Sequence, residues 1–112
     1  MPVEPDNAVL DQLIEAAYRQ TLARFETEVR DGTRNALTEL ATYRQQRRDY
    51  VSLLRMESVP DEAHALAERL LQTHNLVLPA AMQKTFEMNV TRLLIRLYDD
   101  FIAAAGGSHD SR

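Results

Sequence analysis

The sequence predicts a small all-α domain, a bundle of about four helices over residues 7–31, 34–55, 59–74 and 80–105. Apolar residues recur at three- and four-residue steps, which is the period of an amphipathic helix and not of a strand. The three glycines and four prolines fall near the expected helix ends. With 112 residues, the chain has the length of one domain with one core.

The first predicted helix begins at Asp6 or Asn7, either of which can cap the free N–H groups of a first turn. Gly32 follows the last apolar position and suits a left-handed C-terminal cap. The apolar positions between them form one stripe: Val9, Leu10, Leu13, Ile14, Ala17, Leu22, Phe25 and Val29.

The second predicted helix starts at Thr33 or Asn35 and ends near Arg55. Its apolar stripe is interrupted by the segment YRQQRRDY, residues 43–50, which is polar and basic. We expect this helix either to project into solvent or to lie against a partner, because a weak apolar face gives little packing on a core. The apolar positions are Leu37, Leu40 and Ala41 at one end and Val51 and Leu54 at the other.

The segment Ser58-Val59-Pro60-Asp61 predicts the start of the third helix, with Ser58 as cap, Pro60 in the first turn and an acid three residues after the cap. The helix is expected to stop near His74-Asn75, since Asn tolerates left-handed angles. Its buried stripe is Ala63, Leu66, Ala67, Leu70 and Leu71.

The fourth helix has the densest apolar pattern, wide enough to touch two neighbours, and Gly106-Gly107 end it. Residues 1–106 are thus predicted to be one helical domain and residues 107–112 a disordered tail. We predict a partner interface on this helix, formed by Phe86, Val90, Leu94, Tyr98 and Phe101.

Helix length favours a homodimer. The first and fourth helices, at about 37 Å each, are longer than a compact domain about 30 Å across. Pairing of the long helices between two protomers would cover their overhanging ends. We therefore expect a homodimer or a protein partner.

Composition limits the classes of function. Apolar residues make up 45% and charged residues 27%, as in globular domains. The sequence contains no run of about 18 apolar residues, which a membrane span would need. Cysteine is absent, which excludes disulfides, thiolate–metal sites and thiol nucleophiles. The first residues, MPVEPDNAV, have no basic and apolar signal pattern, so we expect a cytoplasmic protein without a membrane partner.

Positive charge is concentrated in one segment. Residues 34–55 hold five arginines and two acids, a net charge of +3, so the rest carries −7 of the total −4. Arginine grips phosphates and tyrosine stacks on bases, so DNA is a candidate partner. The predicted nucleic-acid surface is Arg44, Arg47, Arg48 and Arg55 with Tyr43 and Tyr50. The alternative is a compositional bias, because the chain has twelve arginines and one lysine.

Metal and catalytic sites are not predicted. Asp61, His64 and Glu68 share a side of the third helix, but a helical metal site needs ligands from a second helix, commonly as Glu-x-x-His, which does not occur here. We expect His74 to interact with the last carbonyls of its helix. No Gly-rich loop precedes a helix. The expectation is a non-enzymatic protein with no cofactor and no small-molecule substrate.

Three segments resemble the helical region that precedes the core-binding and catalytic domains of phage-type tyrosine integrases: RRDYVSLL, AHALAERLLQTHNLVLP and RLLIRLYDDF, within Arg47–Ala105. The resemblance covers about half of the chain. Such recombinases cut DNA with a tyrosine in a separate C-terminal domain, which we do not expect in this chain. No catalytic role transfers to any of its tyrosines, Tyr18, Tyr43, Tyr50 and Tyr98.

The resemblance and the basic segment together predict a non-enzymatic helical interaction module. It would be an accessory or truncated piece of a DNA integration or recombination system with a basic helix surface. The alternative is a dimeric protein–protein interaction or regulatory bundle with no nucleic-acid role.

Overall fold

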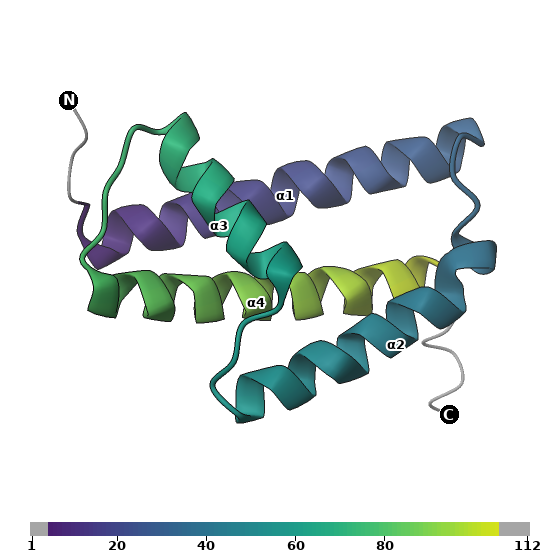
Figure 1. The fold of residues 1–112 in the computed structure, drawn as a ribbon. Coiled ribbons are helices and arrows are strands. Elements are labelled where there is room, and N and C mark those ends of the chain that lie inside the picture. The colour runs from purple at the N-terminus through teal and green to yellow at the C-terminus, as the bar shows by residue number, and fades with distance from the viewer. Residues whose placement is uncertain (1–4, 106–112) are drawn as a thin grey trace.

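The computed structural model describes residues 5–105, which form four helices and no strand (Figure 1). The helices are α1 (Asn7–Asp31), α2 (Ala36–Arg55), α3 (Asp61–Thr73) and α4 (Ala80–Ala104). The all-α prediction is confirmed, and the predicted bounds agree with these within two residues. The predicted disordered tail, residues 107–112, lies outside the described residues.

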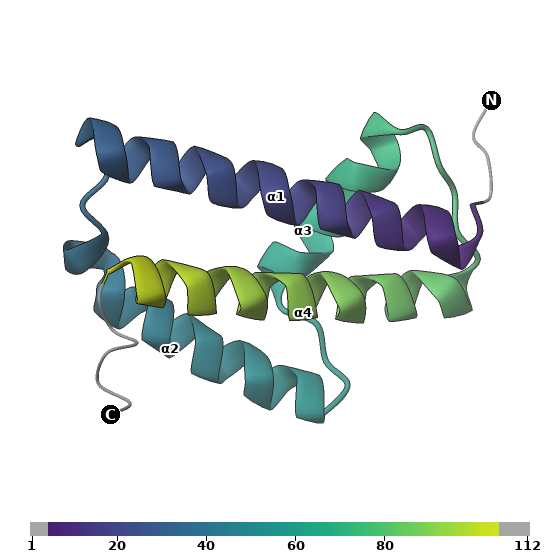
Figure 2. The same cartoon turned by 180° about the vertical axis from the view of Figure 1, so that it is seen from behind.

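Helix α4 is the centre of the fold and packs against each of the other three helices. Helices α1, α4 and α2 lie side by side with α4 in the middle, and α3 crosses one side of this layer (Figures 1 and 2). Helix α1 runs parallel to α4, and α2 runs antiparallel to both. The opposite side of the layer carries no further helix in the described part of the chain.

The described chain is elongated, with extents of 45 × 32 × 22 Å. The two 25-residue helices α1 and α4 lie along each other, so both are accommodated within one protomer. Helix length therefore does not by itself require a second protomer.

The apolar stripe of α4 forms the core and not a partner interface. Among the five residues predicted for that interface, exposed fractions range from 0% for Val90 to 9% for Phe101. The prediction is wrong because α4 packs against three helices, which together cover the whole stripe. The buried residues are Phe86, Val90, Leu94, Tyr98 and Phe101.

Aromatic rings connect α1, α2 and α4 at one end of the core. The rings of Phe25 and Phe101 are stacked with centroids 3.9 Å apart. The ring centroid of Tyr43 of α2 lies 6.0 Å from that of Phe25 and 5.3 Å from that of Phe101. These large apolar surfaces fix the spacing of the three helices in the layer.

One carboxylate connects α2, α3 and α4. The hydroxyls of Tyr50 and Tyr98 both donate to Oε1 of Glu62, at 3.0 Å for Tyr98. Burial, reinforced by the negative Glu62 carboxylate, raises the pKa of both tyrosines. Both phenols therefore remain protonated donors, and Glu62 ties the crossing helix α3 to the layer.

Three helices end in the same backbone motif, with a residue in the left-handed region just after the helix. These residues are Gly32, Glu57 and Asn75, with φ values of 81°, 56° and 55°. The two predicted left-handed ends, at Gly32 and Asn75, are confirmed. After α3, for example, the N–H of Leu76 donates to Leu71 O at 2.8 Å.

The start of α3 differs from the prediction. Ser58 does not cap α3, because the N-cap position is occupied by Pro60. The N–H of Ser58 donates to Leu53 O at 2.9 Å and so completes the end of α2. Helix α3 begins at Asp61 after Pro60, without a side-chain cap. Of the alternatives left open for the other starts, Asp6 caps α1 and Asn35 caps α2.

Replacing Glu57 by glycine tests the left-handed end of α2. A side chain at φ 56° is strained and glycine is not, so we expect Glu57→Gly to raise the free energy of unfolding by about 0.5 to 1 kcal/mol. Urea denaturation measures it. The matched control, Glu26→Gly within α1, is expected to lower stability by about 1 kcal/mol. If both variants lose the same free energy of unfolding, the backbone at Glu57 is not strained.

Removing the Glu62 carboxylate leaves two buried phenols without their acceptor. We expect Glu62→Ala to lower the free energy of unfolding by about 1 to 3 kcal/mol. Adding Tyr50→Phe and Tyr98→Phe to this variant removes the two hydroxyls that have lost this acceptor, so part of the loss is expected to return. If the triple variant is less stable than Glu62→Ala, the shared carboxylate is not what stabilises the pair. Chemical denaturation gives all three values.

Candidate binding face of helices α2 and α4

Tyr43 and Tyr50 are not part of a nucleic-acid surface. They are 5% and 8% exposed and point into the core, because a spacing of seven residues puts both on the side of α2 that faces α4. The hydroxyl of Tyr43 donates to Glu39 Oε1 at 2.7 Å and accepts from Arg34 Nη1 at 3.2 Å. Neither ring is available to stack on a base, so the prediction is wrong for both.

The four predicted arginines share the flank of α2 that turns away from α3. Arg47 forms an ion pair with Asp99 of α4, which fixes which flank this is. Arg48 Nη2 donates to Gln45 Oε1 at 2.8 Å. Arg44 lies one turn from Arg48, and Arg55 lies in the last turn of α2.

Two neighbouring stripes run along this side of the layer, and we call their ten residues the open face. Each stripe follows three- and four-residue steps along one helix, and the two helices run antiparallel. The Arg47–Asp99 ion pair joins the two stripes. The stripe of α2 contains Leu40, Arg44, Arg47, Val51 and Leu54. The stripe of α4 contains Met88, Arg92, Ile95, Asp99 and Ile102.

The open face is accessible along its whole length. Arg92 and Asp99 are exposed, and the other eight residues are half-buried. Ile95 and Ile102 pack against the edge of the core. Helix α3 lies on the other side of the layer, so no described helix covers this face (Figure 2). At the start of α2, Leu37 is 69% exposed and extends the apolar surface.

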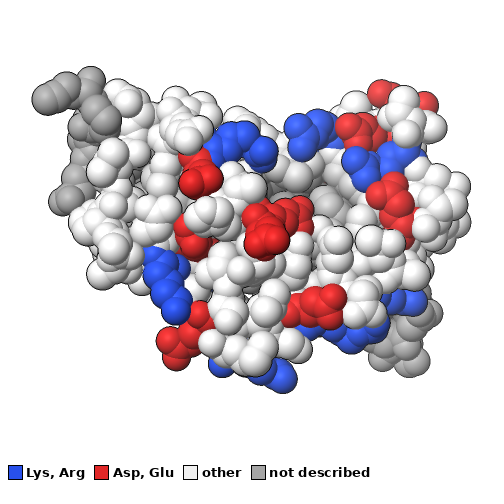
Figure 3. Space-filling model, viewed as in Figure 1, with Lys and Arg blue, Asp and Glu red and all other residues white. Residues whose placement is uncertain are grey.

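Positive charge dominates the open face and its borders. Arg44, Arg47 and Arg92 lie within it against one acid, Asp99. Arg96 borders it on α4, where its guanidinium carbon lies 3.7 Å from the centroid of the Tyr18 ring and Nη1 lies 3.3 Å from Glu15 Oε1. Arg48 and Arg55 border it on α2. On the side that carries α3, acidic and basic side chains are interspersed (Figure 3).

Sequence reasoning missed Arg92 and Arg96 because it considered basic residues only within α2. Their four-residue spacing was a signal that α4 has a basic stripe beside its apolar one. That this stripe lies next to the arginines of α2 is a tertiary fact, shown here by the Arg47–Asp99 contact.

A second polar cluster links α3 to α4. His64 Nδ1 lies 2.8 Å from Glu87 Oε2, and Gln83 Nε2 donates to the same oxygen at 3.1 Å. His64 Nε2 lies 3.6 Å from Glu68 Oε2. The hydrogen bond to Glu87, together with the charges of Glu87, Glu68 and Asp61, raises the pKa of His64. Within residues 5–105, no group of three or more His, Asp or Glu residues is arranged to hold a metal ion.

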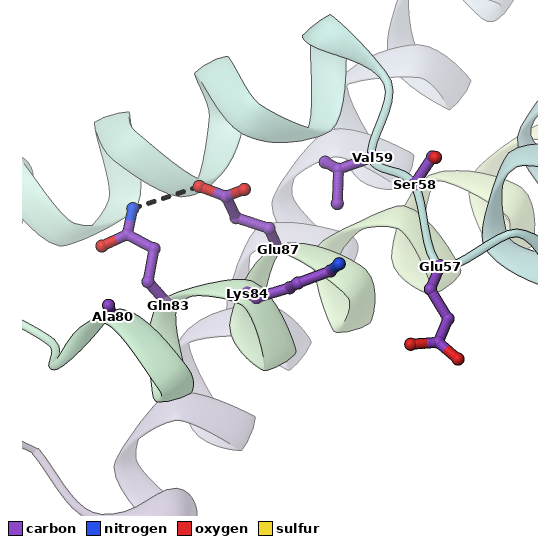
Figure 4. A pocket seen from close by; sticks show the side chains of 7 residues that line it. All are labelled: Glu57, Ser58, Val59, Ala80, Gln83, Lys84 and Glu87. Atoms are coloured by element: carbon purple, nitrogen blue, oxygen red, sulfur yellow. Dashed lines mark hydrogen bonds between the residues drawn. The ribbon is translucent and has the colours of Figure 1, made fainter.

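An open pocket of about 630 Å³ lies beside this cluster, between the loop after α2 and the first half of α4 (Figure 4). Gln83 directs its amide toward Glu87, so the carboxylate is already bonded from within the protein. The cluster therefore serves as a link between helices. The pocket is lined by Glu57, Ser58, Val59, Ala80, Gln83, Lys84 and Glu87. At the other end of α3, His74 Nδ1 lies 3.0 Å from Leu70 O, as predicted.

Within residues 5–105, no helix has the length and apolar content needed to cross a membrane. No family model, no curated protein and no solved structure matches the chain. The resemblance to the integrase segment therefore stays a prediction, and the candidate site rests on its geometry.

The His64–Glu87 link makes stability depend on pH. Because the pKa of His64 is raised above its ordinary 6.5, its stabilising contribution is complete below that value and is lost as pH rises through the folded pKa. We expect the wild-type protein to lose more stability between about pH 6 and pH 8.5 than His64→Gln does. Urea midpoints at both values measure this. An equal dependence of stability on pH in the wild-type protein and in His64→Gln would refute the link.

Proposed function

We propose that the chain is a non-enzymatic helical interaction module that binds a partner protein through the open face. The observation that carries this proposal is a row of half-buried apolar side chains with no described helix over them: Leu40, Val51, Leu54, Met88 and Ile95. Contiguous apolar surface rimmed by polar residues is typical of protein-interaction sites.

The way α2 packs supports this proposal. One side of the helix carries Tyr43 and Tyr50, which fill the core against α4. The adjacent flank carries Leu40, Val51 and Leu54, which are half-buried and do not belong to the set of residues packed against the core. Burying these side chains under a partner removes their remaining apolar area from water, at about 25 cal/mol per Å².

Contact with DNA is a second proposal, and the arginines favour it. Arg44, Arg47, Arg48 and Arg55 share one flank of α2, and Arg92 and Arg96 extend the positive surface onto α4. Together with the resemblance to the integrase segment, they support a role in a DNA integration or recombination system. The tyrosines, which lie in the core, add nothing to it. DNA binding by such a surface would fall steeply between about 50 and 200 mM salt.

A photo-crosslinking residue in place of Val51 tests the proposed function. In cells of the source organism, we expect it to give a discrete protein adduct, because Val51 lies within the open face. The same residue in place of Ala65, which is exposed on α3, is the control and is expected to give none. Arg92→Glu in the Val51 variant is expected to weaken binding by about 1.4 kcal/mol or more, and so to reduce the yield of the adduct at least tenfold. Equal adducts from both positions, or a nucleic-acid adduct from Val51 alone, would contradict a protein partner.

A further inference from the structure

We propose that the partner presents one acidic amphipathic helix, which lies along the open face between α2 and α4. This inference rests on the proposed function and names the chemistry of the partner. Three features of the described residues carry it: the charge of the face, its dimensions, and the position of its single acid.

The charge of the face is opposite to that of the protein. The whole chain has a net charge of −4, yet among residues 5–105 six arginines lie on or beside the open face, where Asp99 pairs with Arg47 and Glu15 pairs with Arg96. Two copies meeting through this face would bring like charges together, which costs free energy. An acidic partner is the complementary one. The six are Arg44, Arg47, Arg48, Arg55, Arg92 and Arg96.

The dimensions of the face fit one helix. From Leu40 to Leu54, the stripe of α2 is about 21 Å long, and two adjacent helices are together about 20 Å wide. The projected area of about 400 Å² is below the roughly 800 Å² that each partner buries in a standard interface. A helix of about four turns covers this length, and helix-in-groove recognition uses apolar anchors at three- and four-residue steps.

The arginines border the apolar row on both sides. On α2, Arg48 lies beyond Arg44, farther from α4, and on α4, Arg96 lies toward α1, where it contacts Tyr18. A helix lying on Val51 and Ile95 would carry carboxylates on both of its flanks to meet these two rows. Such pairs, at the rim of an interface, contribute mostly to orientation and association rate.

Asp99 adds a restriction in the middle of the face. Its carboxylate is paired with Arg47, so this arginine contributes no net charge to the centre. An acidic residue at the centre of the partner helix would meet Asp99, and like charges at an interface are unfavourable. The partner helix is therefore apolar at its centre and acidic at its flanks.

The probe for this inference is a fluorescent 18-residue peptide with leucines at three- and four-residue steps and glutamates on both flanks. Fluorescence anisotropy measures the binding of the peptide to the full chain at about 50 and 150 mM salt. At these concentrations the Debye length is about 14 and 8 Å, respectively. We expect saturable binding, and at least tenfold weaker binding of the same peptide with lysine for glutamate. Arg48→Glu combined with Arg92→Glu is expected to weaken binding at least tenfold, while Arg69→Glu on α3 leaves it unchanged.

The wild-type chain provides a readout that does not depend on the variants. In methyl NMR spectra, the acidic peptide is expected to shift the signals of Val51 and Ile95, which lie in the open face, more than those of Leu66 and Leu70 of α3. Equal shifts on both sides, or equal binding of the lysine peptide, would overturn the inference.

Two other occupants give distinct results. If duplex DNA displaces the peptide and binds more tightly, the partner is a nucleic acid and the acidic helix is refuted. If the chain sediments as a dimer that Val51→Asp dissociates, the occupant is a second copy, which refutes it equally. If the Val51 crosslink to a protein persists while the acidic peptide fails to bind, the inference fails and the proposed function stands.

Discussion

The fold depends on one constraint: every other helix packs against α4. Helices α1 and α2 flank α4, and α3 crosses it, so α4 is covered on three sides. Its buried apolar side chains point in all three of these directions. The fourth side then remains at the surface. There Met88, Ile95 and Ile102 stay half-buried beside the exposed Arg92 and Asp99. The candidate binding face is thus a direct consequence of a central helix with only three neighbours.

Polar groups in the core determine how the crossing helix sits. Tyr50 and Tyr98 are buried side chains whose hydroxyls lie at the edge of the core, where each donates to an acceptor. Glu62 supplies it from the first turn of α3, and among the described residues no buried side-chain polar atom lacks a partner. Apolar packing alone fixes the orientation of a helix less tightly than directional hydrogen bonds do. The carboxylate of Glu62 therefore helps to hold α3 on its side of the layer, together with the buried Ala63, Ala67 and Leu71.

Helix periodicity predicted where the helices lie, because an amphipathic pattern is a local property. The ends at Gly32 and Asn75 were predictable from residue type, whereas Glu57 is not a residue that favours left-handed angles. Because Glu57 adopts left-handed angles, Ser58 belongs to the end of α2, and α3 starts later than predicted, at Asp61. Position in the sequence also did not reveal which side of a helix faces the core. Tyr43 and Tyr50 among arginines look like a binding surface until α4 is seen to lie against them.

The contrast between the two flanks of α2 explains why the candidate site was predicted only in part. Composition predicts the basic residues of α2, but the sequence pattern places their apolar neighbours in an interrupted core stripe and does not single out Arg92 and Arg96. Only the antiparallel packing of α2 on α4, marked by the Arg47–Asp99 ion pair, brings the two sets together. Because this pair neutralises the centre, the remaining positive charge lies toward the edges of an apolar row. A phosphate backbone interacts with the arginines and makes no use of the apolar row, whereas an amphipathic helix uses both its apolar side and its charged flanks. This arrangement is the physical reason for preferring a protein partner to DNA.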